Sequence, residues 1–509
     1  MKNINIIIRK SFLFLFLILV GCSNFEDLNT NPDSSTKANA SMTATGVILS
    51  SLKFNGRDAH AFLQPQAFAK YIGFANQSQM SQQYNEMGNG SFEGMTMLQN
   101  VEKMVQYATG TPTENSYKGI AKFARAYLFY HLTMQMGDVP YTDANKGETG
   151  LYRPKFDTQK DVLIGILDEL KEADSYFSKG IVFDGDPTPY KGDPTKWRKA
   201  SNAFALKVLM SLSKKEADPS LNIKARFAEI VNANNLLEES TGFLGLNYSI
   251  VDIHPLSGTN DLFTSRTVIS SLLIDELKRL NDRRLFYYAE PATKLINDGK
   301  QESDFNAYQG VDAALDYTVM TQKYLEGEYS LLNQRYLKDY ASEPRMRMTY
   351  AEQQLILAEA RILNWITVGD AKKYYESGVK SALKEQMKTK AIYAHAMAID
   401  QAYIDNYFTG NVAFASTTGD QLKQIWYQRY ILNFMQDATS SYFEYRRTNY
   451  PNFPVDPTTN LNIDEPTKIP VRWLYPTSES SYNRENYEKA LADQYDGYDG
   501  VNKVMWVLK

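Results

Sequence analysis

Residues 193–213 read DPTKWRKASNAFALKVLMSLS, and this stretch has the pattern of an amphipathic helix. Its apolar side chains recur every three or four residues, at Trp197, Ala200, Phe204, Val208 and Leu212. That spacing places them on one face of an α-helix with about 3.6 residues per turn. Asp193 and Pro194 come just before the stripe, in the order of an N-cap and a first helical residue. The sequence therefore predicts a helix that begins at Pro194 and buries one face.

The same period recurs along much of the chain. Further stripes occupy residues 117–136, 158–177, 269–280, 351–362 and 422–434. Thr158 and Asp161 have the spacing of a capping box before the second of these. The helices fall into loose, alanine-rich pairs like those of tetratricopeptide proteins, without a strict repeat of about 34 residues. We predict a mainly α fold of tetratricopeptide-like helix pairs.

Long irregular insertions are expected between these pairs. Helical patterning lapses at residues 140–157, 180–194, 238–266, 287–344 and 449–509, and the last of these is rich in proline. Loops of this length in a compact protein are usually functional or packed as irregular structure. No Gly/Ser-rich linker separates the helices, so we predict one continuous domain over residues 41–509.

Composition excludes several classes of protein. The 509 residues contain one cysteine, which rules out an intramolecular disulfide framework and cysteine-ligated metal sites. The histidines are widely separated, and none has the spacing of a helical zinc site; they are His60, His131, His254 and His395. A net charge of −4 without a basic stripe argues against nucleic-acid binding. We therefore predict no cofactor, no metal site and no nucleic-acid partner.

The N-terminus has the features of an export signal. Lys2, Arg9 and Lys10 precede an apolar run at residues 12–20, which is too short to cross a bilayer that takes about 20 helical residues. The run ends in Leu-Val-Gly-Cys at 19–22, which resembles the bacterial lipobox, in which the cysteine is diacylated, for example with palmitate. We predict a lipoprotein signal peptide at 1–21 and lipidation of Cys22 as the only membrane attachment. The alternative is an ordinary signal peptide with an incidental cysteine.

The residues that follow, 22–40, are polar and rich in turn-forming types. Such a composition is typical of an extended, flexible connection. We predict that this segment is a tether between the lipid anchor and the folded domain.

No catalytic signature is present in the sequence. It contains no G-x-S-x-G elbow, no phosphate-binding loop and no H-E-x-x-H motif. A glycosidase-like pair of carboxylates leaves no such signature, so the motif search alone does not remove that class. His131, on an alanine-rich helix face, is interpreted as a hydrogen-bonded core residue rather than a catalytic base. We predict that the protein is not an enzyme and has no catalytic residues.

Seven motifs follow the lipobox in order. They are LNTNPD at 28–33, GDVPYTDA at 137–144, RPKFDTQKDVLIGILDELKEA at 153–173, WRKASNAFALKVLMSLS at 197–213, MTYAEQQLILAEA at 348–360, YRRTNYP at 445–451 and IPVRWLYPTSESSYNRENYEKAL at 469–491. Together they resemble the motifs of the SusD/RagB family of nutrient-binding outer-membrane lipoproteins. Asn449 departs from the pattern because glycine is common there. Arg446 and Arg447 are the type of residue that pairs with carboxylates or with carbonyls of the proline-rich tail.

The resemblance implies a helical body on tetratricopeptide-like pairs and a specific task. Members of this family are anchored by lipid at the outer membrane, facing the cell exterior. They capture an oligosaccharide, or in some members a peptide, and pass it to a TonB-dependent, SusC-like transporter. Their ligand contacts lie on variable loops, so no contact residue is carried over.

Candidate ligand-binding residues come instead from the side-chain types that sugars need. Sugar recognition uses flat apolar rings together with hydrogen-bonding groups in a partly wet site. Two stretches outside the helical stripes offer this mixture: Phe74, Gln77, Tyr84 and Phe92 in one, and Phe263, Arg266, Tyr308, Tyr324 and Tyr329 in the other. We expect them to converge on the face opposite the tether. The alternative is that these rings are ordinary packing residues under long loops.

Two other classes of function stay open at this point. A surface-anchored hydrolase on a helical scaffold requires a carboxylate pair in a deep cleft, and a tetratricopeptide adaptor binds protein alone. Exposed rings on a shallow surface favour the binding protein over both.

Overall fold

The computed structural model describes residues 38–54, 58–76, 78–258 and 262–509. The predicted signal peptide, Cys22, most of the predicted tether and Gln77 lie outside these residues. The first described helix, α3 (Ala40–Leu52), begins where the tether was predicted to end. Its N-cap is Asn39, whose side chain accepts a hydrogen bond of 2.9 Å from the Met42 amide.

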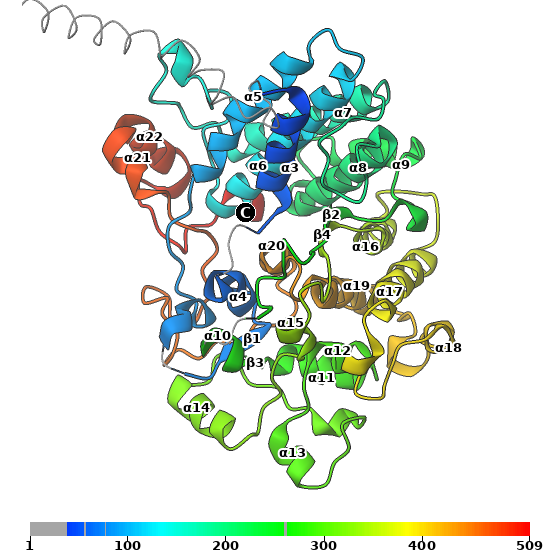
Figure 1. Cartoon of the computed structure of the whole chain (residues 1–509). Helices are drawn as coiled ribbons and strands as arrows, with labels where there is room; N and C mark the ends of the chain where they lie inside the picture. Colours follow the sequence, from blue (N-terminus) through cyan, green and yellow to red (C-terminus); the bar gives the residue numbers. More distant parts are fainter. Residues whose placement is uncertain (1–37, 55–57, 77, 259–261) are drawn as a thin grey trace, which may run out of the picture.

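The longer helices make up the upper part and the right side of the molecule in Figure 1. They are α5 (Met97–Ala108), α6 (Glu114–Met136), α7 (Gln159–Phe177), α8 (Pro194–Ser211), α9 (Ile223–Asn232), α16 (Tyr350–Ile362), α17 (Ala371–Met387), α19 (Thr418–Asn433) and α20 (Ala438–Thr448). Neighbours in sequence pack against each other: α6 along α7, α7 along α8, and α16 along α17. This arrangement confirms the predicted mainly α fold with tetratricopeptide-like pairs.

Local capping explains why these helices begin where they do. Helix α8 begins at Pro194, and the Asp193 side chain accepts from the Thr195 amide at 2.9 Å. Thr158 caps α7 by accepting from the Asp161 amide at 3.2 Å. Both starts agree with the sequence prediction, because the caps satisfy amides that lack an intrahelical partner.

Further helices and two small sheets complete the described part of the fold, some of them in segments predicted to be irregular. The helices are α4 (Ala59–Phe68), α10 (Leu262–Ser265), α11 (Ser271–Arg279), α12 (Arg284–Tyr288), α13 (Thr293–Asn297), α14 (Tyr317–Leu325), α15 (Arg335–Lys338), α18 (Gln401–Asp405), α21 (Thr477–Tyr482) and α22 (Arg484–Tyr495). The expected lapses at 287–344 and 449–509 are therefore wrong in part. Most of these helices are too short for a periodic stripe, and in α22 only Ala490, Leu491 and Tyr495 are buried.

Both sheets join segments that are far apart in sequence. Strand β1 (Ile72–Phe74) pairs antiparallel with β3 (Thr267–Ile269), and β2 (Leu244–Leu246) pairs antiparallel with β4 (Arg345–Met348). The first pairing connects the region after α4 to the region before α11. The second lies near α16 in Figure 1.

The proline-rich tail is held on the helical body by buried arginine side chains. Arg446 donates to the Val471 carbonyl at 2.7 Å and to the Met134 carbonyl at 2.6 Å, so it ties the tail to α6. This confirms the predicted use of Arg446. Asn449 ends α20 in the left-handed conformation, with φ of 57°, which asparagine adopts more readily than most residues. The departure from glycine is therefore compatible with the turn.

Candidate ligand-binding site

The pairing of β1 with β3 brings the two predicted stretches together. Phe74 lies opposite Thr267 in this sheet and stacks on Phe263, with ring centroids 5.0 Å apart. The His60 ring stacks on Phe263 at 4.4 Å. Phe74 is buried, whereas Phe263 is half-buried at the edge of the same stack. The stack therefore joins α4, β1 and α10 beneath the surface.

Helix α14 lies next to this stack, at the lower left of Figure 1. The guanidinium of Arg266 lies 5.9 Å from the centre of the Tyr324 ring, and the Tyr324 hydroxyl donates to the Ser265 carbonyl at 3.0 Å. Tyr324 packs against a small apolar cluster that contains the buried Tyr329. A cation beside a ring within about 6 Å is a favourable contact and keeps both groups oriented.

Tyr84 connects this region to the proline-rich tail. Its hydroxyl donates to the Leu315 carbonyl at 2.9 Å, and its own carbonyl accepts from the Leu461 amide at 2.8 Å. The Thr459 hydroxyl donates to the Ala314 carbonyl at 2.8 Å. Burial raises the pKa of Tyr84, so its hydroxyl stays protonated and bonded.

Two of the predicted residues lie elsewhere. Phe92 is half-buried before α5 and packs edge-on against Phe156, 6.1 Å away. Tyr308 is fully buried, donates to the Glu302 carbonyl at 2.8 Å and contacts Phe286 at 5.2 Å. The sequence did not distinguish these positions, because a tyrosine in an irregular segment has the same pattern whether it faces solvent or the core. Gln77 lies outside the described residues.

Exposed apolar side chains around α14 were missed by the sequence analysis. We call the following set the α14 face: Arg266, Tyr317, Val319, Tyr324, Leu325, Leu461 and Ile463. Tyr317 is 40% exposed, Leu325 70% and Ile463 85%. Single exposed apolar residues are normal, but a group of them rimmed by polar side chains is typical of a binding surface. The one relevant signal in the sequence was Asp316, the N-cap of α14, which indicates that a helix begins at Tyr317.

A larger hollow lies in another part of the molecule, between β4 and the C-terminal end of α17. Its volume is about 570 Å³. Its three carboxylates are each in an ion pair: Glu239 with Lys384 at 2.7 Å, Glu343 with Arg335 at 2.6 Å, and Glu385 with Lys388 at 2.5 Å. A hydrolase of the glycosidase type needs one carboxyl group free to protonate the leaving group. The ion pairs of this cavity do not offer one.

The described chain offers no cluster of three or more histidine, cysteine or acidic side chains with metal-binding geometry. Within the same residues, no helix is both long and apolar enough to span a bilayer. His131 donates from Nδ1 to the Tyr127 carbonyl at 2.8 Å, and burial lowers its pKa to about 4. This contact agrees with its interpretation as a hydrogen-bonded core residue.

Comparison with known proteins places the fold. Residues 32–476 match the family model SusD-like, described as starch-binding associating with outer membrane. The chain belongs to the SusD-like family. Among proteins with curated descriptions, none matches the chain.

Solved structures of the SusD-like family superpose closely. A SusD homologue from Bacteroides fragilis is 37% identical, with a TM-score of 0.88 over 93% of this chain and 100% of that one. A Bacteroides vulgatus protein, assigned by inference to the outer membrane and to nutrient binding, is 33% identical, with a TM-score of 0.83 and the same coverage. A chitin-binding SusD homologue from Flavobacterium johnsoniae, 16% identical over 92% of this chain and 98% of that one, has a TM-score of 0.68 and shares the fold.

Proposed function

We propose that this SusD-like protein is a non-catalytic, surface-exposed lipoprotein that binds a nutrient oligosaccharide. It then delivers the ligand to a TonB-dependent, SusC-like transporter in the outer membrane. The family description and the chitin-binding homologue support a glycan as ligand. The observation that carries the proposal on this chain is the α14 face, where the exposed side chains of α14 share a helix with Tyr324, whose ring lies 5.9 Å from the Arg266 guanidinium.

The α14 face has the groups that a sugar chain requires. The exposed ring of Tyr317 offers an apolar surface for the C–H face of a sugar, and Arg266 offers charged donors for its hydroxyls. The exposed side chains of Val319 and Leu325 lie on the same helix as Tyr317. Such a shallow, wet surface suits a chain of sugar units rather than a single enclosed one.

Tyr84 and Tyr308, which the sequence predicted as ligand contacts, are packing residues rather than exposed contact residues. Tyr84 is 6% exposed and Tyr308 is fully buried. Their substitution by alanine would therefore report on folding stability, because removing a buried ring leaves a cavity. Tyr317 is the sharper probe of binding.

The test is titration calorimetry with soluble chitin, starch and cellulose oligosaccharides. We expect Tyr317→Ala and Arg266→Ala each to weaken binding of the cognate oligosaccharide by roughly tenfold, or about 1.4 kcal/mol, with unchanged melting temperature. The matched control is Tyr107→Ala, on α5, because Tyr107 is 42% exposed and Tyr317 is 40% exposed. Wild-type affinity in both α14-face variants would refute this face as the binding site.

The anchor and the partner are further parts of the proposal. Removal of residues 1–21 would leave lipidated Cys22 at the start of a tether, and the domain would extend from residue 41 to 509. Cys22→Ala should release the protein from the membrane fraction, and retention with lipid attached would contradict the anchor. Gentle detergent extraction should recover a transporter barrel together with this protein, in equal amounts of the two. If the transporter is present in the same membranes but absent from such extracts, a stable complex is contradicted.

A further inference from the structure

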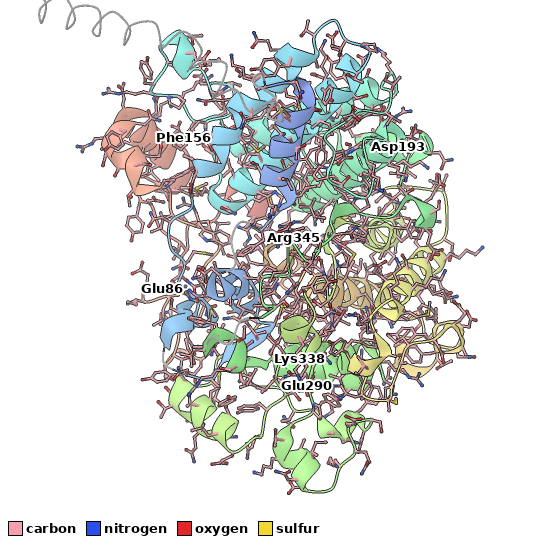
Figure 2. The ribbon with its side chains drawn as sticks, in the orientation of Figure 1. Glu86, Phe156, Asp193, Glu290, Lys338 and Arg345 are labelled. Carbon is pink, nitrogen blue, oxygen red and sulfur yellow. The ribbon has the colours of Figure 1, made fainter. Side chains whose placement is uncertain are left out.

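The cavity of about 570 Å³ has walls from several segments that are far apart in sequence. They include residues on both sides of β2, residues 341–346 around the start of β4, residues 381–389 at the end of α17, and side chains from α12 and the end of α19. Arg345, labelled near the centre of Figure 2, lies between the lining residues Pro344 and Met346. This volume lies within the range of about 300–1,000 Å³ that encloses small ligands.

Aromatic rings supply the apolar part of the lining. Tyr288 and Phe434 are in contact, with ring centroids 4.9 Å apart, and Phe243 and Tyr350 also line the cavity. Phe434 is buried, while Phe243 and Tyr350 are half-buried. These rings can cover the C–H surface of a small ligand.

A buried hydroxyl in the lining has no protein partner. The Ser342 side chain lines the cavity and is 8% exposed, and its hydroxyl makes no hydrogen bond within the described chain. A buried polar group without a partner costs free energy, so its presence in a folded protein calls for an explanation. A bound molecule would supply the missing partner. Tyr288, which is 7% exposed, also lines the cavity and contributes a second hydroxyl.

The charged side chains of the cavity are already neutralised by the protein. Glu343 accepts from Arg335 at 2.6 Å and from Gln436 at 2.8 Å, and Arg284 pairs with Asp282 at 2.6 Å. At the α17 side, Glu239 pairs with Lys384 and Glu385 pairs with Lys388, so these charges are also neutralised within the protein. No charge is therefore left for an ionic ligand, and a neutral molecule with several hydroxyls fits best.

We propose that this cavity is a second saccharide-binding site, which takes one or two neutral sugar units and uses the Ser342 and Tyr288 hydroxyls to bind them. The choice of a sugar among neutral polar molecules rests on the proposed function. The site is separate from the α14 face, because α14 lies at the lower left of Figure 1, whereas α17 lies on the right. The partly open cavity suits a chain end or a free disaccharide, and the exposed α14 face suits a longer chain.

The experiment uses Tyr288→Phe and Ser342→Ala with the free disaccharides maltose, cellobiose and N,N′-diacetylchitobiose. Binding at millimolar concentration is followed by ligand-observed NMR and calorimetry. We expect one of the three to bind the wild type, and each variant to weaken it about tenfold. The melting temperature of unliganded Ser342→Ala should be unchanged or higher, because this variant removes a buried polar group that has no protein partner, and that of Tyr288→Phe should be unchanged. The control is Tyr498→Phe, whose side chain is 58% exposed.

Several results would overturn the cavity site. They are failure of all three disaccharides to bind, wild-type affinity in both variants, or a lower melting temperature that shows a structural role for the hydroxyls. Arg266→Ala separates the two sites. If the α14 face is not a binding site but the cavity is, Arg266→Ala keeps its oligosaccharide affinity and Tyr288→Phe loses disaccharide binding. If Arg266→Ala loses oligosaccharide affinity and Tyr288→Phe keeps disaccharide binding, the cavity site alone is refuted.

Discussion

Replacing Arg429 with methionine should strongly destabilise the helical body. Arg429 lies on α19 and is buried together with Arg447 and three glutamates. It contacts Glu352 at 2.9 Å, Glu444 at 2.6 Å and Glu359 at 3.6 Å, while Arg447 contacts Glu359 at 2.8 Å and Glu444 at 2.7 Å. These residues join α16, α19 and α20, so their charges stabilise one another across three helices.

The magnitude follows from the charges left behind. In Arg429→Met, three buried carboxylates lose one of their guanidinium partners, and breaking a buried pair in this way costs about 3–5 kcal/mol. The pKa of Glu444 gives a second measure. Burial alone would raise it, but Arg429 and Arg447 more than offset burial and lower it from 4.5 to about 2. At about 1.4 kcal/mol per pKa unit, that shift corresponds to roughly 3 kcal/mol.

The pH dependence has a definite sign. Because the pKa of Glu444 is lower in the folded than in the unfolded chain, its stabilising contribution is complete above about pH 4.5 and is lost as the pH falls toward 2. Without Arg429 the carboxylates protonate more easily, so the deficit of the variant should be largest at pH 7 and smaller at pH 4.

Urea denaturation at these two pH values, followed by tryptophan fluorescence, measures both effects. The matched control is Arg484→Met, which removes the exposed pair of Arg484 with Glu488 on α22 and should leave the midpoint unchanged. A loss below about 1 kcal/mol for Arg429→Met at pH 7, or the same loss at both pH values, would refute the reasoning.

Two further predictions concern the backbone and a buried lysine. Burial lowers the pKa of Lys70 from 10.5 to about 7, with Asp312 offsetting part of the effect, so the unfolded chain binds the extra proton between these values. The free energy of unfolding should therefore rise above pH 7 by up to about 1.4 kcal/mol per pH unit. In denaturation curves, Lys70→Met should flatten this rise between pH 7 and 9. The same slope of unfolding free energy against pH in the variant and the wild type would contradict the role of Lys70. Gly192→Ala places a Cβ 1.8 Å from the Phe183 carbonyl oxygen, whereas Gly110→Ala, at the same φ of 77°, meets nothing within 4 Å. Both should lower the melting temperature, Gly192→Ala clearly more, and equal losses would show that the clash is relieved without cost.

The features that the sequence predicts well are local ones. The start of α8 at Pro194 and the cap of α7 at Thr158 depend on neighbouring residues alone. The stacking of Phe74 on Phe263 depends instead on the pairing of β1 with β3, and three-residue strands carry too little pattern to predict that pairing. The binding candidates were therefore chosen by residue type, which includes the buried Tyr308 and omits Tyr317.

The α14 face is held in place by groups that do not themselves face the solvent. The Tyr84 hydroxyl bonds to the Leu315 carbonyl, the Leu461 amide to the Tyr84 carbonyl, and the Thr459 hydroxyl to the Ala314 carbonyl. All three of these contacts end on main-chain oxygens, which every residue supplies. Exposed side chains such as that of Tyr317 can therefore be exchanged at little cost in stability, since surface changes usually stay within about 0.5 kcal/mol. A rigid helical scaffold with such a face can change its ligand by substitutions at α14 while the arginine-centred core stays unchanged.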